Sequence, residues 1–96
     1  MTPAFTVIAT AHFARDLRKL AKRHTELAEH YARALAILET DPYNRSRTHP
    51  IKKLENVSAG EGQYRIRFGH FRFRYDIEGQ TVYLKLCSLR REDTYR

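Results

Sequence analysis

Apolar and polar residues alternate strictly in QYRIRFGHFRFRYDI, residues 63–77. Successive strand residues point to opposite faces of a sheet, so this alternation predicts two strands with one apolar and one basic face. Gly69-His70 interrupts the pattern, and glycine at the first position of a two-residue loop suits a type II′ hairpin turn. This turn would pair Phe68 with Phe71, Arg67 with Arg72, Ile66 with Phe73 and Arg65 with Arg74. One face of the hairpin would then carry four guanidinium groups.

The N-terminal half shows one strand pattern followed by two helical patterns. AFTVIA (Ala4–Ala9) is expected to form a short strand, and Thr10 can cap the helix that follows. Apolar residues then recur at helical spacing in two runs. They are Phe13, Leu17, Leu20 and Ala21 in the first run, and Leu27, Tyr31, Leu35 and Leu38 in the second. With Thr25 as the second cap and Asp41-Pro42 as the stop, the pattern predicts an antiparallel helical hairpin.

The C-terminal half adds further strands. IKKLENV (Ile51–Val57) could enter the sheet, and TVYLKLCSL (Thr81–Leu89) is expected to follow a tight turn at Glu78-Gly79. This turn would pair Arg72 with Lys85 and Arg74 with Tyr83, with Val82, Leu84 and Leu86 on the apolar face and Tyr83, Lys85 and Cys87 on the basic face. The fold class that follows is α+β, an N-terminal helical hairpin packed on a small curved antiparallel β-sheet.

Composition narrows the class of protein. A length of 96 residues fits a single domain over 1–96, and a formal net charge of +7 favours an anionic partner. Cys87 is the only cysteine, which excludes an intramolecular disulfide and fits a reducing compartment. Without a signal-like or membrane-spanning segment, we expect a cytoplasmic protein with no membrane partner. No metal-ligand spacing or phosphate-binding glycine loop is present, so neither metal nor cofactor is expected.

The basic face of the predicted sheet carries Arg65, Arg67, Arg72, Arg74 and Lys85. It could be a solvated surface, in which long side chains cover the apolar layer beneath. However, the inner strands carry arginine and lysine without a cross-strand carboxylate, because Asp76 is expected at the far end, opposite Thr81. A solvated face selected for stability would mix positive and negative charges. Arginine forks bind phosphate bidentately and stack on bases. No acid–base pair is evident among His70, Glu92 and Tyr95, so a polyanion-binding sheet is better supported by these residues than a nuclease.

A helical hairpin followed by IKKL, GQYRIRFGHFRFRY, a short strand and a terminal RREDTY resembles the RelE/ParE superfamily of bacterial type II toxins. The resemblance covers essentially the whole chain. Phe71, Arg72 and Tyr75 match the family's aromatic-Arg-x-x-Tyr element, and Arg91 and Tyr95 match its final Arg-x-x-x-Tyr. The resemblance implies a toxin neutralised by a cognate antitoxin. In the RelE-like branch, it implies cleavage of mRNA in the ribosomal A site without metal.

The resemblance also implies roles for individual residues. The catalytic set would be Arg72, Arg91 and Tyr95, and Arg65 and Arg67 match the family's basic residues of the first hairpin strand. Together with the other basic residues of the predicted surface, the expected RNA-binding set is Arg65, Arg67, Arg74, Lys85, Arg90, Lys52 and Lys53. RelE-type enzymes often have lysine at the positions of Arg65 and Arg67, and arginine cannot act as a base at neutral pH. Arg90 stands where relatives often have histidine. The general acid and base therefore stay unassigned.

Two other functions are compatible with the same fold. The ParE-like branch poisons DNA gyrase, and a non-catalytic basic module would only bind nucleic acid. In either toxin branch the expected partner is an antitoxin, and operator DNA would be bound only by the toxin–antitoxin complex. The retained Arg72, Arg91 and Tyr95 favour the ribosome-dependent endonuclease.

Overall fold

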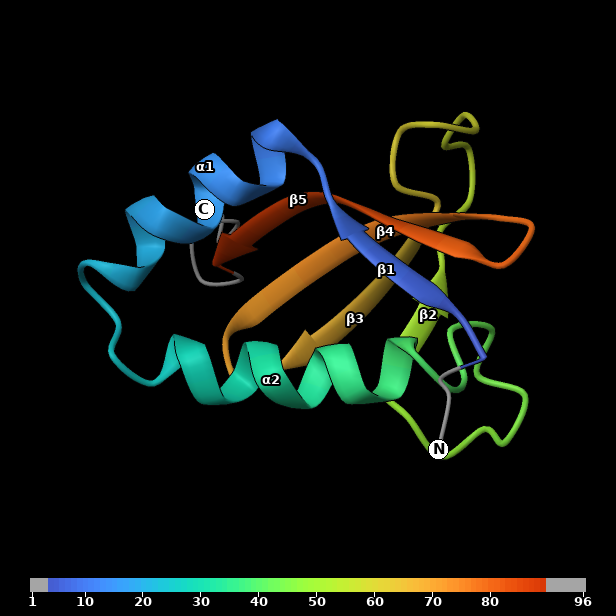
Figure 1. Ribbon diagram of the computed structural model, residues 1–96, viewed down its shortest axis with the longest axis horizontal. Coiled ribbons are helices and arrows are strands. Elements are labelled where there is room, and N and C mark those ends of the chain that lie inside the picture. Colours follow the sequence, from blue (N-terminus) through green and yellow to red (C-terminus); the bar gives the residue numbers. More distant parts are fainter. Residues whose placement is uncertain (1–3, 90–96) are drawn as a thin grey trace.

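The structure is a computed structural model that describes residues 4–89. Two helices and five strands form an α+β fold, as predicted (Figure 1). In chain order they are β1 (Thr6–Ala9), α1 (Ala11–Ala21), α2 (Leu27–Leu38), β2 (Ile51–Lys53), β3 (Tyr64–Phe68), β4 (Phe71–Glu78) and β5 (Thr81–Leu89). Within the described part of the chain, no helix is long and apolar enough to cross a membrane.

The sheet is mixed, with strand order β1-β5-β4-β3-β2. The four strands from β2 to β5 pair antiparallel, but β1 joins β5 in parallel, with Thr6 opposite Thr81. The prediction of an antiparallel sheet was wrong at this edge. The alternation in a strand of four residues carries no information about the direction of its partner, which is decided by the path of the chain through both helices.

Both helices pack on the same face of the sheet and run antiparallel, as predicted (Figure 1). Phe13 of α1 and Ala34 of α2 are buried against Phe71, Phe73 and other apolar residues of the strands. Phe71 and Phe73 are at most 1% exposed, as the predicted alternation requires. We call the other side of the sheet the open face.

The two predicted helix caps have different outcomes. Thr10 is the N-cap of α1, where its hydroxyl accepts from the Phe13 N–H at 3.3 Å and donates to the Leu84 carbonyl at 2.7 Å. Thr25 does not cap α2, because the N-cap is Glu26 and its side chain makes no capping bond. A backbone turn replaces the cap, since the Leu27 N–H donates to the His24 carbonyl at 3.1 Å.

The β3–β4 hairpin has the predicted register through all four pairs, and its turn is Gly69-His70. Gly69 has φ +59°, whereas the φ of His70 is not positive. This is the pattern of a type II′ turn, which needs a positive φ only at its first position. A Cβ on Gly69 would also lie 3.1 Å from Nε2 of His30 on α2. The turn therefore requires glycine here, and the packing against α2 favours it.

The β4–β5 hairpin differs from the predicted register. Its turn is Gly79-Gln80, because glycine takes the first turn position with φ +60° and Glu78 pairs with Thr81. A β-bulge then follows, because Tyr75 pairs with Leu84 but Arg74 pairs with Leu86, which leaves Lys85 as the extra residue.

The bulge changes which residues of β5 face the core. Before it, Val82 and Leu84 are buried as predicted; after it, Cys87 and Leu89 are buried instead. Leu86, predicted on the apolar face, is therefore on the open face, and Cys87 belongs to the core. The predicted pairs Arg72–Lys85 and Arg74–Tyr83 were wrong, and Arg72 pairs with Ser88.

Candidate functional site

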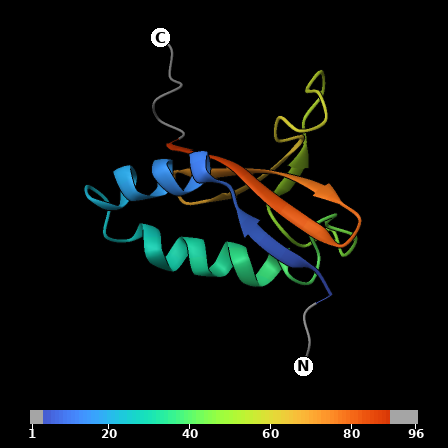
Figure 2. The same cartoon turned by 45° about the horizontal axis from the view of Figure 1, so that its top comes forward.

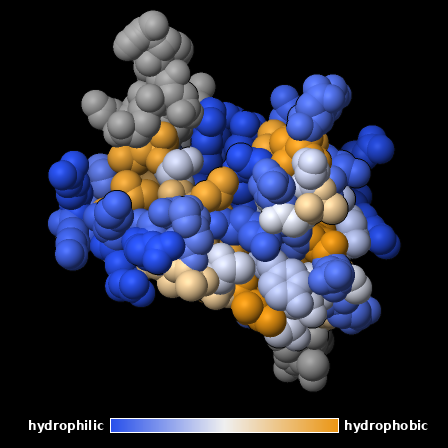
Figure 3. Space-filling model, turned by 90° about the horizontal axis from the view of Figure 1, so that it is seen from above, coloured by the Kyte–Doolittle hydropathy of each residue, from blue (hydrophilic) through white to orange (hydrophobic). Residues whose placement is uncertain are grey.

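Basic side chains lie in two rows across the open face of the sheet. In one row Lys52, Arg65 and Arg74 are neighbours on β2, β3 and β4, and in the next row Arg67 lies opposite Arg72. Adjacent strands are about 4.8 Å apart, so these cations are close neighbours. We call these five residues the arginine face. Figure 3 views the molecule from above and shows a mostly hydrophilic surface with smaller hydrophobic patches.

The remaining predicted binding residues are placed differently. Lys85 occupies the bulge of β5 and lines a pocket on the open face. Lys53 pairs with Tyr64 on the helix side of the sheet, where its Nζ lies 5.7 Å from the centre of the Tyr64 ring. Lys53 is therefore not part of the arginine face. Three predicted residues lie outside the described residues, namely Arg90, Arg91 and Tyr95.

Arg74 and Asp76 attach the loop before β3 to the open face. The Arg74 guanidinium donates from Nε to the Gly62 carbonyl at 3.0 Å and from Nη2 to the Glu61 carbonyl at 2.9 Å. The Asp76 carboxylate accepts from the backbone N–H groups of Gly62 and Gln63 at 2.9 and 3.0 Å. We call Arg74, Asp76 and these loop contacts the loop clamp. Figure 2 shows the loop rising from the sheet on the side away from α2.

Close packing accompanies these hydrogen bonds. Gly62 has φ +82°, and a Cβ at this position would lie 3.0 Å from the Arg74 Cβ. Asp76 is 8% exposed and pairs with Tyr83, so the prediction that it lies opposite Thr81 was wrong. Its carboxylate also lies on the same face as Arg74, which moderates the repulsion expected between Arg65 and Arg74. No local sequence signal identifies this clamp, because its partners are 12 to 14 residues apart.

A pocket of about 300 Å³ lies between the clamped loop and the far ends of β4 and β5. Its polar lining comes from Gln63, Asp76, Glu78, Tyr83 and Lys85. Tyr83 and Asp76 stand directly opposite one another on adjacent strands. The pocket therefore combines an aromatic ring, carboxylates and a cation beside the arginine face.

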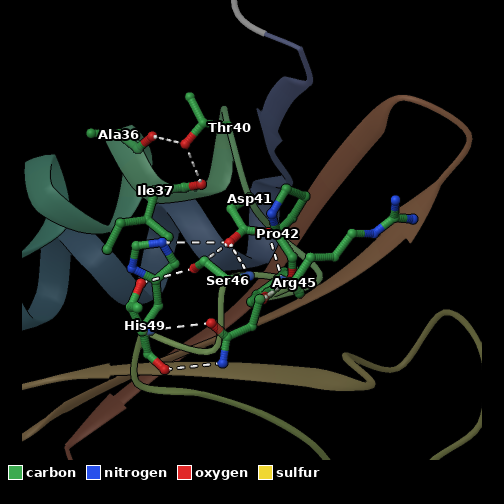
Figure 4. Close-up of polar contacts among 11 residues, drawn as sticks. Ala36, Ile37, Thr40, Asp41, Pro42, Arg45, Ser46 and His49 are labelled. Atoms are coloured by element: carbon green, nitrogen blue, oxygen red, sulfur yellow. Dashed lines mark hydrogen bonds and ion pairs between the residues drawn. The ribbon is translucent and has the colours of Figure 1, made fainter.

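A second polar cluster lies in the loop after α2 (Figure 4). The Asp41 carboxylate accepts from the backbone N–H of Arg45 at 2.8 Å and from the Ser46 hydroxyl at 2.8 Å, and His49 Nε2 is 3.6 Å away. Burial alone would raise the pKa of Asp41, but these hydrogen bonds outweigh it and hold the pKa below its usual range. Ser46 and His49 both face Asp41 rather than each other, so the cluster braces the loop and does not form a nucleophilic triad.

Histidines are not part of the arginine face. His70 is an exposed residue of the β3–β4 turn. His30 of α2 packs against Phe68 and Phe71, with ring centroids at 6.4 and 5.6 Å, on the helix side of the sheet. The described residues therefore do not identify a histidine acid or base for the site.

Comparison with known proteins adds an independent observation. No protein-family model matches the chain, and no curated protein matches it. A chain of the archaeal RelE–RelB complex from Pyrococcus horikoshii is similar in structure, with a TM-score of 0.66 and 22% identity, over 91% of this chain and 96% of that chain. The chain has the RelE fold.

A second RelE-type neighbour agrees with the first. A chain of the toxin–antitoxin complex RelBE2 from Mycobacterium tuberculosis has a TM-score of 0.59 and 28% identity, over 93% of this chain and 100% of that chain. The predicted likeness to the RelE/ParE superfamily is thus confirmed in three dimensions, and the two neighbours come from the RelE–RelB and RelBE2 complexes.

Proposed function

We propose that this protein is the toxin of a type II toxin–antitoxin pair and acts as a metal-independent, ribosome-dependent mRNA endonuclease. The observation that carries the proposal is an open sheet face lined by arginines on a RelE fold. Both structural neighbours come from toxin–antitoxin complexes, which supports the toxin role and a cognate antitoxin as partner. Its targets, the ribosome and mRNA, would be met in the cytoplasm.

The proposed chemistry is transesterification within the RNA. A general base takes the proton of the 2′-hydroxyl, whose oxygen attacks the adjacent phosphorus to form a 2′,3′-cyclic phosphate. The bond from phosphorus to the 5′ oxygen of the next nucleotide breaks, and a general acid protonates that oxygen to give a 5′-hydroxyl. Negative charge builds up on the phosphoryl oxygens, where positioned guanidinium groups stabilise it. Arg72 is the proposed clamp for the scissile phosphate, with Arg65 and Arg67 beside it on β3.

Arg91 and Tyr95 complete the proposed catalytic set on the family pattern alone, since they lie outside residues 4–89. Tyrosine has an ordinary pKa of about 10, so a role in proton transfer would require a strongly cationic setting. Replacing Tyr95 by phenylalanine separates the two roles that the position could have. Proton transfer predicts a slower reaction, whereas stacking on a base predicts little change.

The proposed antitoxin is acidic and contributes an amphipathic segment that covers part of the toxin. The net charge of +7 supports this complementarity. Expression of the toxin alone should slow growth, and co-expression of the neighbouring small reading frame should restore it. Absence of toxicity in the native host, together with no neighbouring protein that binds, would contradict the toxin role.

A cleavage experiment tests the enzymatic part. Purified protein is mixed with translating ribosomes and a defined message in the presence of a chelator that leaves ribosomes intact, and the cleaved ends are sequenced. We expect cuts within the A-site codon, 2′,3′-cyclic phosphate ends and protection by added antitoxin. Intact message with accumulation of gyrase-cleaved DNA would favour the gyrase poison. RNA binding without cleavage would favour a non-catalytic module.

A further inference from the structure

The pocket beside the loop clamp has the chemistry of a nucleobase site. Tyr83 supplies an aromatic ring at one wall, and single-stranded bases stack on such rings with little dependence on sequence. Glu78 and Asp76 supply carboxylate oxygens, which accept hydrogen bonds from exocyclic amino groups of bases. Lys85 at the bulge supplies a cation suited to a phosphate. These are the three components with which proteins bind unpaired nucleotides.

Side-chain hydrogen bonds hold the walls of the pocket. Asp76 and Arg74 clamp residues 61–63, and the Gln63 side chain is fixed because its Nε2 donates to the Val57 carbonyl at 3.1 Å. Each Asp76 oxygen accepts one loop N–H and retains capacity for a second hydrogen bond. The pocket volume of about 300 Å³ is sufficient for a single base.

The pocket lies farther along the strand that carries Arg72, on the same face of the sheet. Asp76 follows Arg72 by four residues on the same strand and the same face, which is roughly 13 Å at about 3.3 Å per residue. We propose that the pocket binds a base that flanks the scissile phosphate and carries an exocyclic amino group, with Tyr83 stacking on it and Glu78 contacting its edge. Arg74 is then a positioning residue that holds the pocket wall. This inference rests on the proposed function, because it places RNA on the open face.

Binding of short RNAs tests the subsite separately from cleavage. The probes are fluorescein-labelled hexauridylate and hexamers in which one uridine is replaced by cytidine or adenosine at each position in turn. Binding is measured by anisotropy at several salt concentrations. The unaltered protein should bind the best substituted hexamer at least 5-fold more tightly than hexauridylate, on the order of a single hydrogen-bonded edge contact.

Two variants and one matched control identify the pocket. Glu78→Gln should reduce that preference to less than 2-fold. Tyr83→Leu should weaken all hexamers about 5-fold or more, since stacking contributes to every base. The control is Glu55→Gln, which removes the same charge from an exposed position outside the pocket.

The outcomes separate this inference from the proposed function. Hexamers that do not bind, that bind without base preference, or whose preference survives Glu78→Gln and Tyr83→Leu unchanged would overturn the subsite, whatever the ribosome experiment gives. A preference that depends on Glu78 together with an absence of ribosomal cleavage would keep the subsite and refute the nuclease. Where cleavage occurs, Glu78→Gln should also broaden the base preference next to the cut.

Discussion

The two faces of the sheet are built by the same strands, but the positions of the side chains on each face are decided in different ways. On the covered face Phe71, Phe73 and Tyr75 are buried at every second position of β4, and alternation alone is sufficient to place them. On the open face Arg72 and Arg74 also alternate, but alternation does not specify the hydrogen bonds that join Arg74 to a distant loop. A hydrophobic layer tolerates any partner of suitable volume, whereas each polar contact requires a particular register.

The largest expected effect is on the covered face. Phe73→Ala removes a fully buried ring that lies 6.2 Å from the Phe13 ring and 5.9 Å from the Tyr31 ring, between centroids. We expect a loss of about 3–5 kcal/mol of unfolding free energy, which would leave little of the stability of a domain this size. Urea denaturation followed by circular dichroism measures it.

The matched control for Phe73→Ala lies on the open face. Arg67 is exposed on β3, and Arg67→Ala should change the unfolding free energy by no more than about 0.5 kcal/mol. Similar losses for the two variants would contradict the division of the sheet into a packed face and a functional face.

The next effect concerns Arg72 and Arg74, two arginines of one strand. If Arg72 contacts the scissile phosphate, Arg72→Ala should slow single-turnover cleavage on ribosomes about 100-fold or more. Arg74→Ala should slow it less, because the Arg74 guanidinium is engaged by the Glu61 and Gly62 carbonyls. Arg33→Ala on α2 removes the same charge far from the open face and serves as control. Equal losses for Arg72→Ala and Arg74→Ala would indicate a general electrostatic surface instead.

A smaller effect tests the loop clamp. Asp76→Asn replaces a carboxylate that accepts two backbone N–H groups, one of which would then face an amide nitrogen. We expect a loss of about 1–3 kcal/mol and faster hydrogen exchange at the Gly62 and Gln63 amides. Glu61→Gln is the control, since only the backbone carbonyl of Glu61 takes part in the clamp. Unchanged exchange at both amides in Asp76→Asn would show that the clamp does not hold the loop.

The smallest effect is a pH dependence that originates in the core. Burial, with a contribution from the Asp16 charge, raises the pKa of Cys87 to about 12 from an ordinary value of 9.0. Between these values the unfolded chain loses the thiol proton while the native state keeps it, so the unfolding free energy should fall as pH rises. Cys87→Ala should make this fall shallower between pH 9 and 11, as measured by urea denaturation.

Buried tyrosines provide the comparison for Cys87. Burial also raises the pKa of Tyr75, whose hydroxyl donates to the Pro42 carbonyl at 2.7 Å, so part of the alkaline destabilisation should persist without the thiol. In the native state at pH 8, Cys87 should react with a thiol reagent only on unfolding, because it is 5% exposed. Rapid reaction of the folded protein would place the thiol outside the core.

Local sequence determined the helices, the β3–β4 hairpin and the apolar face of β4. These follow from periodicity and from the positive φ of Gly69, which involve only neighbouring residues. The sequence also indicated that arginines gather on one sheet face. It could not indicate which of these arginines would be bonded to a loop.

Only the tertiary structure decided the direction of β1, the bulge at Lys85 and the loop clamp. The bulge buries Cys87 and Leu89 in place of Leu86, and the clamp uses Asp76 to hold residues that precede it by 13 and 14 positions. The physical reason is common to all three features. Strand direction, register and the partner of a buried carboxylate depend on contacts between segments distant in sequence, and no local pattern specifies them.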